Sequence, residues 1–354
     1  MTKTMSSKHN NKVLKAGRSR LFDGGVEKGD PTSIHGERMP LAKDQVRSAA
    51  VSVDSSSKKA RSRRRPRKLN INKPYPAWFY LPAGVVYGVL FLVPTFASFY
   101  FAFTRWTFAE TEFIGFDNFV TFFSEPRLFK GFINTFIYAV VTSGTKVVLG
   151  LLLAVALTSG IFARGYLRAV VFFPVLVSTI GVGITFKILM DPFDGIINKF
   201  LALFGIEGPG WLTDPNLALY SVAAVDIWKG LGLATLIYIA GIVAIPDEYY
   251  EAARVDGASS WAMFRNITVP LVRPAMVTVI ILSLIGGLRS FDLIWAMTGG
   301  GPGFASDVIA STIYKQYAAG FYGLSTAGNV VLFLVVTVII LPLYLVLNRR
   351  SKEV

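Results

Sequence analysis

The chain has 354 residues, of which 53% are hydrophobic and 16% are charged, and it contains no cysteine. A soluble domain has about a quarter of its residues charged, so this composition is typical of a membrane protein. The lack of cysteine excludes a disulfide framework, a thiolate-bound metal and a cysteine nucleophile. The two histidines, His9 and His35, both lie near the N-terminus, which leaves imidazole chemistry without an obvious site.

The formal net charge of +14 is concentrated in residues 1–73. This segment holds 19 of the 36 basic and 6 of the 22 acidic residues, so it carries +13 by itself. It is polar and lacks an apolar period, which predicts a disordered cytoplasmic tail. Its basic run at 61–68 fits a nucleic-acid patch, a twin-arginine export signal or a topology anchor that touches anionic lipid. The long apolar segment that follows favours the anchor, so we expect membrane lipid rather than nucleic acid as the partner.

Residues 74–354 are predicted to form an all-α, polytopic integral membrane domain with six transmembrane helices. No charged residue lies between Lys73 and Arg105, and about 20 apolar residues are enough to cross the hydrocarbon core. Five further apolar segments follow. The six predicted spans are 74–104, 133–159, 169–186, 217–244, 274–297 and 325–348.

The distribution of Lys and Arg predicts that the N-terminus and the C-terminus are both cytoplasmic. With this orientation the inside segments carry 17 basic residues and the outside segments carry six. Basic residues near span ends are retained on the cytoplasmic side. The chain is therefore predicted to be a multi-pass protein of the cytoplasmic membrane.

The loop between the fourth and fifth spans, residues 246–273, is predicted to form two short helices. Pro246 as the first helical residue, followed by two acidic residues in the first turn, is typical of a helix start. Gly257 is a natural helix stop, and a serine at 259 or 260 would cap a second helix that the prolines at 270 and 274 close. Such a pair fits a plain connection, a DNA-binding helix-turn-helix or an amphipathic element that enters a partner's groove. The adjacent membrane spans argue against DNA.

Within this loop the sequence reads Glu251-Ala252-Ala253, then Gly257, then Ile267-Thr268-Val269-Pro270. This pattern resembles the EAA loop of permease subunits of binding-protein-dependent ABC importers, which usually have Leu in place of Val269. Further segments resemble the carbohydrate-uptake branch, of the maltose and glycerol-phosphate type. They are Glu251–Ala258 with Phe264, Phe113–Phe119, Asn134-Thr135, Gly195–Asn198 and Thr298–Pro302.

The resemblance covers about residues 76–350 and implies an importer with several subunits. The implied partners are a second homologous permease, an ABC ATPase dimer and an extracytoplasmic solute-binding protein. The chain itself lacks a Gly-x-x-x-x-Gly-Lys-Ser/Thr phosphate loop, so ATP would bind to the partner subunits and we expect no cofactor here. The residues that the resemblance assigns to the ATPase contact are Glu251, Ala252, Ala253, Asp256 and Gly257.

Four ionisable residues form two couples inside the predicted spans. Asp226 and Lys229 are three residues apart in the fourth span, and Arg289 and Asp292 are three apart in the fifth. Each couple is predicted to share one helical face and to neutralise itself. The couples would then either fix helix packing or line the substrate path.

Two more residues in the spans have open roles. Trp228 either packs within the bundle or stacks on a sugar ring. Lys146 has no evident local partner, so we expect it to pair with the second permease.

Taken with the resemblance, these features predict a permease for a sugar or sugar-like solute. An enzyme is not expected, because paired carboxylates, a histidine base and a metal cluster are missing from the spans. A permease for glycerol phosphate or a polyol is an alternative, although a phosphate would require a convergent basic pocket. A membrane enzyme or receptor would require buried catalytic groups or a sensor domain.

Overall fold

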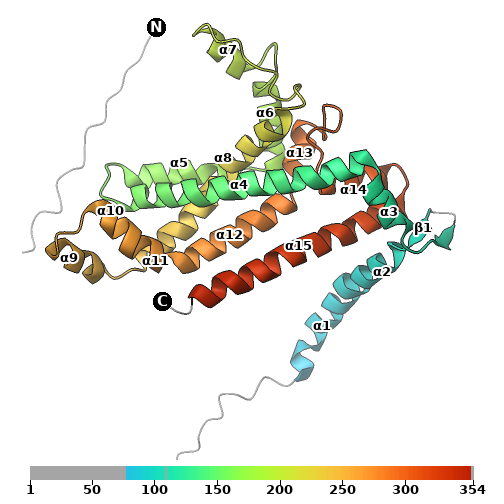
Figure 1. Cartoon of the computed structure of the whole chain (residues 1–354), viewed down its shortest axis with the longest axis horizontal. Coiled ribbons are helices and arrows are strands. Elements are labelled where there is room, and N and C mark those ends of the chain that lie inside the picture. The colour runs from blue at the N-terminus through green and yellow to red at the C-terminus, as the bar shows by residue number, and fades with distance from the viewer. Residues whose placement is uncertain (1–76, 108–109, 352–354) are drawn as a thin grey trace, which may run out of the picture. The chain divides into compact units, whose positions relative to one another are not determined.

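The structure, a computed structural model, describes residues 77–107 and 110–351 (Figure 1). The predictions of disorder and of lipid contact for the tail at 1–73 lie outside these residues. The regular structure of the described part is helical apart from a short hairpin, in which β1 (Thr104–Trp106) pairs antiparallel with β2 (Thr111–Phe113). The predicted all-α class is confirmed.

Four helices are long and apolar enough to cross a membrane, and the number rises to six if each of two bent helix pairs counts as one span. This count rests on length and composition. The first of the four, Trp78–Phe101, combines η1 (Ala77–Tyr80), α1 (Leu81–Tyr87), η2 (Gly88–Leu92) and α2 (Val93–Phe101). The other three are α4 (Pro126–Thr158), α8 (Ala218–Val243) and most of α15 (Tyr322–Ser351).

The third span is not the continuous helix predicted over 169–186. It consists of α5 (Arg164–Leu176) and α6 (Thr179–Leu189), which are bent by 98° relative to each other. Pro174 has no N–H to donate to the preceding turn, which weakens the end of α5. Val177 then adopts an extended conformation and ends the helix. The apolar run predicted a span correctly but concealed this break.

The fifth span is also broken, where the sequence predicted one helix over 274–297. α12 (Arg273–Leu288) ends directly after two consecutive glycines, and three residues separate it from α13 (Asp292–Met297). Glycine loses more backbone freedom than any other residue when it becomes helical. A pair of glycines therefore weakens the end of the helix. At its other end, α12 is bent by 67° from the preceding helical segment, Ser260–Leu271.

The central helices α4, α8 and α12 pack through small residues. A Cβ atom added at Gly150 of α4 would lie 3.0 Å from the Cβ of Ala234 on α8. One added at Gly287 of α12 would lie 2.7 Å from the Cα of Ala139 on α4. Small residues allow backbones to approach closely, which is how helices associate where lipid removes the hydrophobic driving force.

The two ends of α4 lie beside different connecting segments (Figure 1). At 33 residues, α4 is about 50 Å long, so it extends beyond the hydrocarbon core. Its N-terminal end shares a pocket with α14 (Ile309–Ala318) and the start of α15. Its C-terminal end shares a cavity with the loop at 246–273. The remaining helices in the connections are α3 (Asp117–Ser124) and α7 (Ile196–Ala202).

Candidate functional site

The loop at 246–273 forms the two helices that the sequence predicts. α9 (Asp247–Val255) is followed by Gly257, whose φ of +76° lies in the left-handed region that favours glycine. Ser259 caps α10 (Ser260–Met263), because its Oγ accepts a hydrogen bond from the N–H of Ala262 at 3.2 Å. Local sequence rules are sufficient to place this turn.

Two details of the loop differ from the prediction. Pro246 is the N-cap of α9 rather than its first helical residue. The second helix ends at Leu271, between the two prolines, but it contains a π-helical turn, η3 (Phe264–Thr268), before α11 (Val269–Leu271), which the sequence did not predict. A prolyl ring clashes with the carbonyl four residues earlier, and the wider π turn lies where this clash would occur.

The outer surface of the loop combines acidic and apolar side chains. Of the five residues assigned by resemblance to the ATPase contact, Ala253 is half-buried, and Glu251, Ala252, Asp256 and Gly257 are exposed. Three large apolar residues of the same loop, Tyr249, Val255 and Trp261, are 54%, 88% and 67% exposed. Large apolar groups left exposed among charged ones are typical of a surface that contacts another protein or a membrane.

The inner side of the loop is attached to the helix bundle. The hydroxyl groups of Tyr250 and Thr268 are hydrogen-bonded at 3.0 Å, which joins α9 to η3. Tyr250 and Ile267 pack against a buried cluster that includes Tyr238 of α8 and Val272. A cavity of about 470 Å³ remains between the loop and the ends of α4 and α8. These contacts attach α9 to the helix bundle, and of their residues the sequence had indicated Ile267 and Thr268 as part of a motif.

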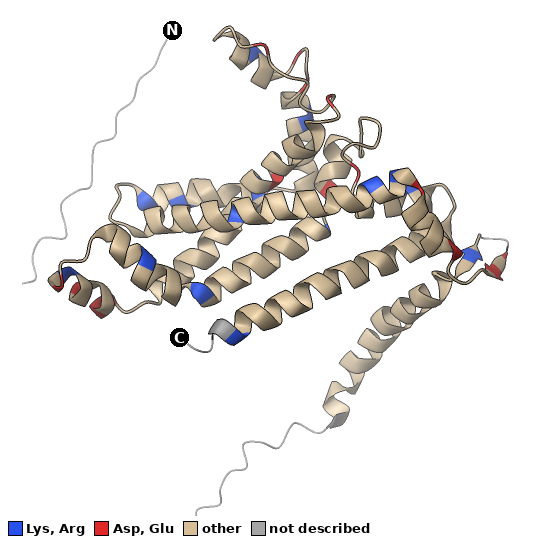
Figure 2. Ribbon diagram, viewed as in Figure 1, with Lys and Arg blue, Asp and Glu red and all other residues tan. Residues whose placement is uncertain are grey.

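Charged residues in the described part of the chain lie mainly in the connections and at helix ends (Figure 2). An exception links α4 to α8, where the Nζ of Lys146 lies 2.6 Å from the Oδ2 of Asp226. The two side chains are 9% and 23% exposed. Gly230 leaves the space that Lys146 fills, because an added Cβ there would lie 2.7 Å from the lysine Cε.

The ion pair lies beside the break between α12 and α13. Tyr138 of α4 is fully buried, and its hydroxyl lies near Asp226 and Ser290 but has no hydrogen-bond partner among the described residues. Ser290 belongs to the three residues that separate α12 from α13. Polar side chains of α4, α8 and the broken fifth span therefore lie near one another, and the Lys146–Asp226 ion pair joins the first two helices.

The predicted pairing of the intramembrane charges is wrong. Asp226 pairs with Lys146 on another helix rather than with Lys229, so Lys146 finds its partner within this chain. Arg289 ends α12 and Asp292 begins α13, so the two do not share a helical face. Three-residue spacing brings side chains together only along an unbroken helix.

The other charged residues of the predicted substrate path do not form ion pairs with one another. Lys229 is half-buried, Arg289 and Asp292 are exposed, and none of the three forms an ion pair within the described residues. Trp228 is 44% exposed, and its ring centre lies 5.3 Å from that of Phe186 on α6. The structure therefore brings Trp228 together with an aromatic residue of the broken third span.

At the opposite end of α4, buried polar groups hold the segment that precedes α14. The side-chain amide of Asn134 donates to the carbonyl oxygens of Ala305 and Asp307, both at 2.9 Å. The Asp307 carboxylate is fully buried and forms an ion pair with Lys315 at 2.7 Å. Because Asp307 and Lys315 are eight residues apart, helical spacing had not indicated this pair.

Comparison with known proteins identifies the family. Residues 146–353 match the family described as "Binding-protein-dependent transport system inner membrane component". The chain belongs to this family. The matched part of the permease begins at Lys146 and includes Asp226 and the complete loop at 246–273.

Two similar proteins carry the names of sugar permeases. The trehalose/maltose transport system permease protein MalF of Thermococcus litoralis is 34% identical over 258 residues, which cover 72% of this chain and 88% of that protein. The probable starch degradation products transport system permease protein AmyD of Thermoanaerobacterium thermosulfurigenes is 31% identical, covering 78% of this chain and 96% of that protein. A bacterial ABC transporter involved in the import of the acidic polysaccharide alginate contains a chain with a TM-score of 0.69 and 25% identity, covering 78% of this chain and 95% of that one.

Proposed function

We propose that this chain is one permease subunit of an ABC importer that moves a sugar or sugar-like solute across the cytoplasmic membrane. ATP hydrolysis on partner subunits would drive the transport. The family match supports the importer class, and the names of the similar permeases support the substrate class. The observation that carries the mechanism is the loop at 246–273, because its outer surface is left exposed while its inner side is attached to the helix bundle.

The loop couples the ATPase to the membrane helices. The exposed acidic and apolar groups around Glu251 enter a groove on the ATPase dimer. Closure of that dimer on ATP then displaces α9, and the Tyr250–Thr268 hydrogen bond carries the displacement into η3. ATP binding thereby favours one of two packings of the permease, which gives alternating access.

The two broken spans are the elements that move. α6 and α13 pack closely, because a Cβ added at Gly183 of α6 would lie 2.6 Å from the Cβ of Ala296 on α13. Each follows a break in its own span, so the two segments turn together against the rigid pair of α4 and α8. Discontinuous helices are a usual way for transporters to build a substrate path.

The same region provides the contacts for a sugar. Trp228 and Phe186 offer aromatic faces to the C–H surface of a pyranose ring, and Lys229, Arg289 and Asp292 are available for its hydroxyl groups. Lys146 is engaged by Asp226, which leaves too few convergent basic groups for a phosphate substrate. The second permease and the external solute-binding protein complete the path, with both termini of this chain in the cytoplasm.

The test is uptake by the complete importer reconstituted in proteoliposomes with its second permease, ATPase dimer and solute-binding protein. Gly257→Val forces a β-branched residue into positive φ at a cost of about 1–2 kcal/mol and misdirects α9. We expect the permease to insert normally, while solute-stimulated ATP hydrolysis and uptake fall several-fold.

Gly205→Val is the matched control, because Gly205 has a φ of +72° in another exposed connection, and an added Cβ meets nothing within 4 Å there or at Gly257. This control should retain wild-type transport. If Gly257→Val also retained it, the loop would be a connector only and the coupling mechanism would be wrong.

A further inference from the structure

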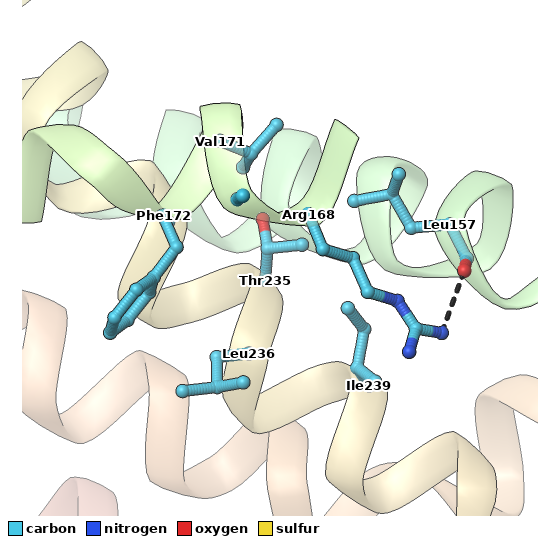
Figure 3. Close-up of a pocket in the computed structure, with 9 residues that line it drawn as sticks. Leu157, Arg168, Val171, Phe172, Thr235, Leu236 and Ile239 are labelled. Carbon is cyan, nitrogen blue, oxygen red and sulfur yellow. Dashed lines mark hydrogen bonds between the residues drawn. The ribbon is translucent and has the colours of Figure 1, made fainter. Parts of the chain in front are cut away.

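A cavity separate from the sugar path and from the coupling loop lies between α4, α5 and α8. Its volume is about 270 Å³, and apolar side chains form most of its wall (Figure 3). Arg168 of α5 is the single charged group among the nine residues that line it. Gly232 of α8 brings the two helices together at its base, since an added Cβ would lie 3.0 Å from the Cα of Phe172.

Arg168 lies at one end of the cavity, and some of its N–H donors have no hydrogen-bond partner among the described residues. One terminal nitrogen donates to the carbonyl oxygen of Leu157 at 2.8 Å, close to the end of α4, where carbonyls lack helical partners. Its Nε is buried and has no hydrogen-bond partner among the described residues. A guanidinium has five N–H donors, and because the Nε is buried, the donors available to an anion are those of the two terminal nitrogens that Leu157 leaves unfilled. Figure 3 shows this group beside Leu157, with Phe172 and Leu236 toward the other end.

A second arginine extends the positive charge. Arg164 is exposed and lies four residues before Arg168 on α5, which places both on one helical face. Neither arginine forms an ion pair with a described residue, and no acidic residue lines the cavity. The end of α4 that Arg168 contacts also borders the loop at 246–273. This is the end that we predict to be cytoplasmic, where anionic lipids give the membrane surface its negative potential.

We propose that this cavity binds one anionic phospholipid. Arg168 and Arg164 hold its phosphate, and one acyl chain occupies the apolar part between Phe172, Leu236 and Ile239. The charge complementarity is specific to such a ligand, because a single molecule satisfies both the unfilled guanidinium donors and the apolar wall. The lipid contacts α5 just before the break at 177–178. It therefore also stabilises α5, which is the part of the third span that precedes the break.

The test uses the full chain assembled with its partner subunits, in nanodiscs of phosphatidylcholine with and without phosphatidylglycerol. Native mass spectrometry then measures the phosphatidylglycerol that stays on the complex. Arg168→Gln should lower the retained amount about fivefold, which is the contribution of one basic residue to attraction by an anionic surface. Arg349→Gln is the matched control, because Arg349 is an exposed arginine at the end of α15, outside the cavity, and should behave as wild type.

Arg168→Gln also removes a contact to the end of α4, so a second variant separates lipid binding from folding. Ala169→Leu fills the cavity and leaves the guanidinium in place, and it should lower the retained phosphatidylglycerol as well. Retention at the wild-type level in both variants would overturn the proposal. Because the natural chain has no cysteine, a Leu236→Cys variant adds one unique thiol at the cavity. Efficient cross-linking of this thiol to the second permease would show that a protein, not a lipid, fills the cavity.

Discussion

The Lys146–Asp226 pair should show strong non-additivity in a double-mutant cycle. Asp226→Asn leaves a lysine that is 9% exposed without its partner, and Lys146→Met leaves an unpaired carboxylate that is 23% exposed. Removing one member of a buried pair costs about 3–5 kcal/mol because the remaining charge stays desolvated. In a membrane the unfolded reference state also finds partners, so we expect about 2–3 kcal/mol for each single variant. The double variant leaves no stranded charge and should recover about 2 kcal/mol of that loss.

The assay is thermal unfolding of the purified complex in nanodiscs, followed by the folded fraction on gel filtration. A loss of about 2 kcal/mol corresponds to a fall of roughly 6 °C in Tm for a domain of this size. The control cycle uses Lys199 and Asp194, which are 3.1 Å apart but whose side chains are 59% and 90% exposed. Exposed pairs contribute little, so that cycle should be additive. Equal additivity in both cycles would refute the reasoning and reduce the intramembrane pair to an incidental contact.

Two further predictions concern single contacts, and a third concerns the predicted topology. Gly230→Ala should destabilise the permease by about 1–3 kcal/mol, because its methyl group meets Lys146; Gly144→Ala, where nothing lies within 4 Å, is the control for this shift in Tm. Tyr250→Phe removes the hydrogen bond to Thr268 and should weaken solute-stimulated ATP hydrolysis while insertion stays normal. A reporter inserted at residue 260 should score cytoplasmic and one at 204 external; an external result at 260 would contradict both the topology and the coupling role of the loop.

The parts of the fold that follow local rules could be predicted from the sequence. A run of apolar residues predicts a span because each span satisfies its own backbone hydrogen bonds. The turn at Gly257 and the cap at Ser259 depend on the conformational freedom of glycine and on one nearby hydroxyl, which the sequence shows directly. The helices around these residues are therefore close to their predicted bounds.

The breaks in the third and fifth spans could not be located in the same way. Hydropathy is insensitive to backbone conformation, so a run such as 169–186 reads as uninterrupted although Pro174 and Val177 end a helix within it. The Gly286–Gly287 pair before the second break is an equally weak signal, because glycine is also the residue that permits close helix packing. Gly287 does pack closely against Ala139, so a glycine at this position does not by itself distinguish a helix break from a close packing contact.

The partner of Asp226 shows why pairing inside the membrane is not a local property. Lys229 is three residues from Asp226 along the chain and Lys146 is 80 residues from it, yet Asp226 pairs with Lys146. A lysine on the same helix reaches the carboxylate only by lying along its surface, whereas Lys146 extends across the interface between α4 and α8 into the space left by Gly230. An ionised group in low dielectric is stabilised most by the partner that is also buried. The choice of partner therefore depends on how α4 and α8 pack, and that packing becomes visible only when both helices are in place.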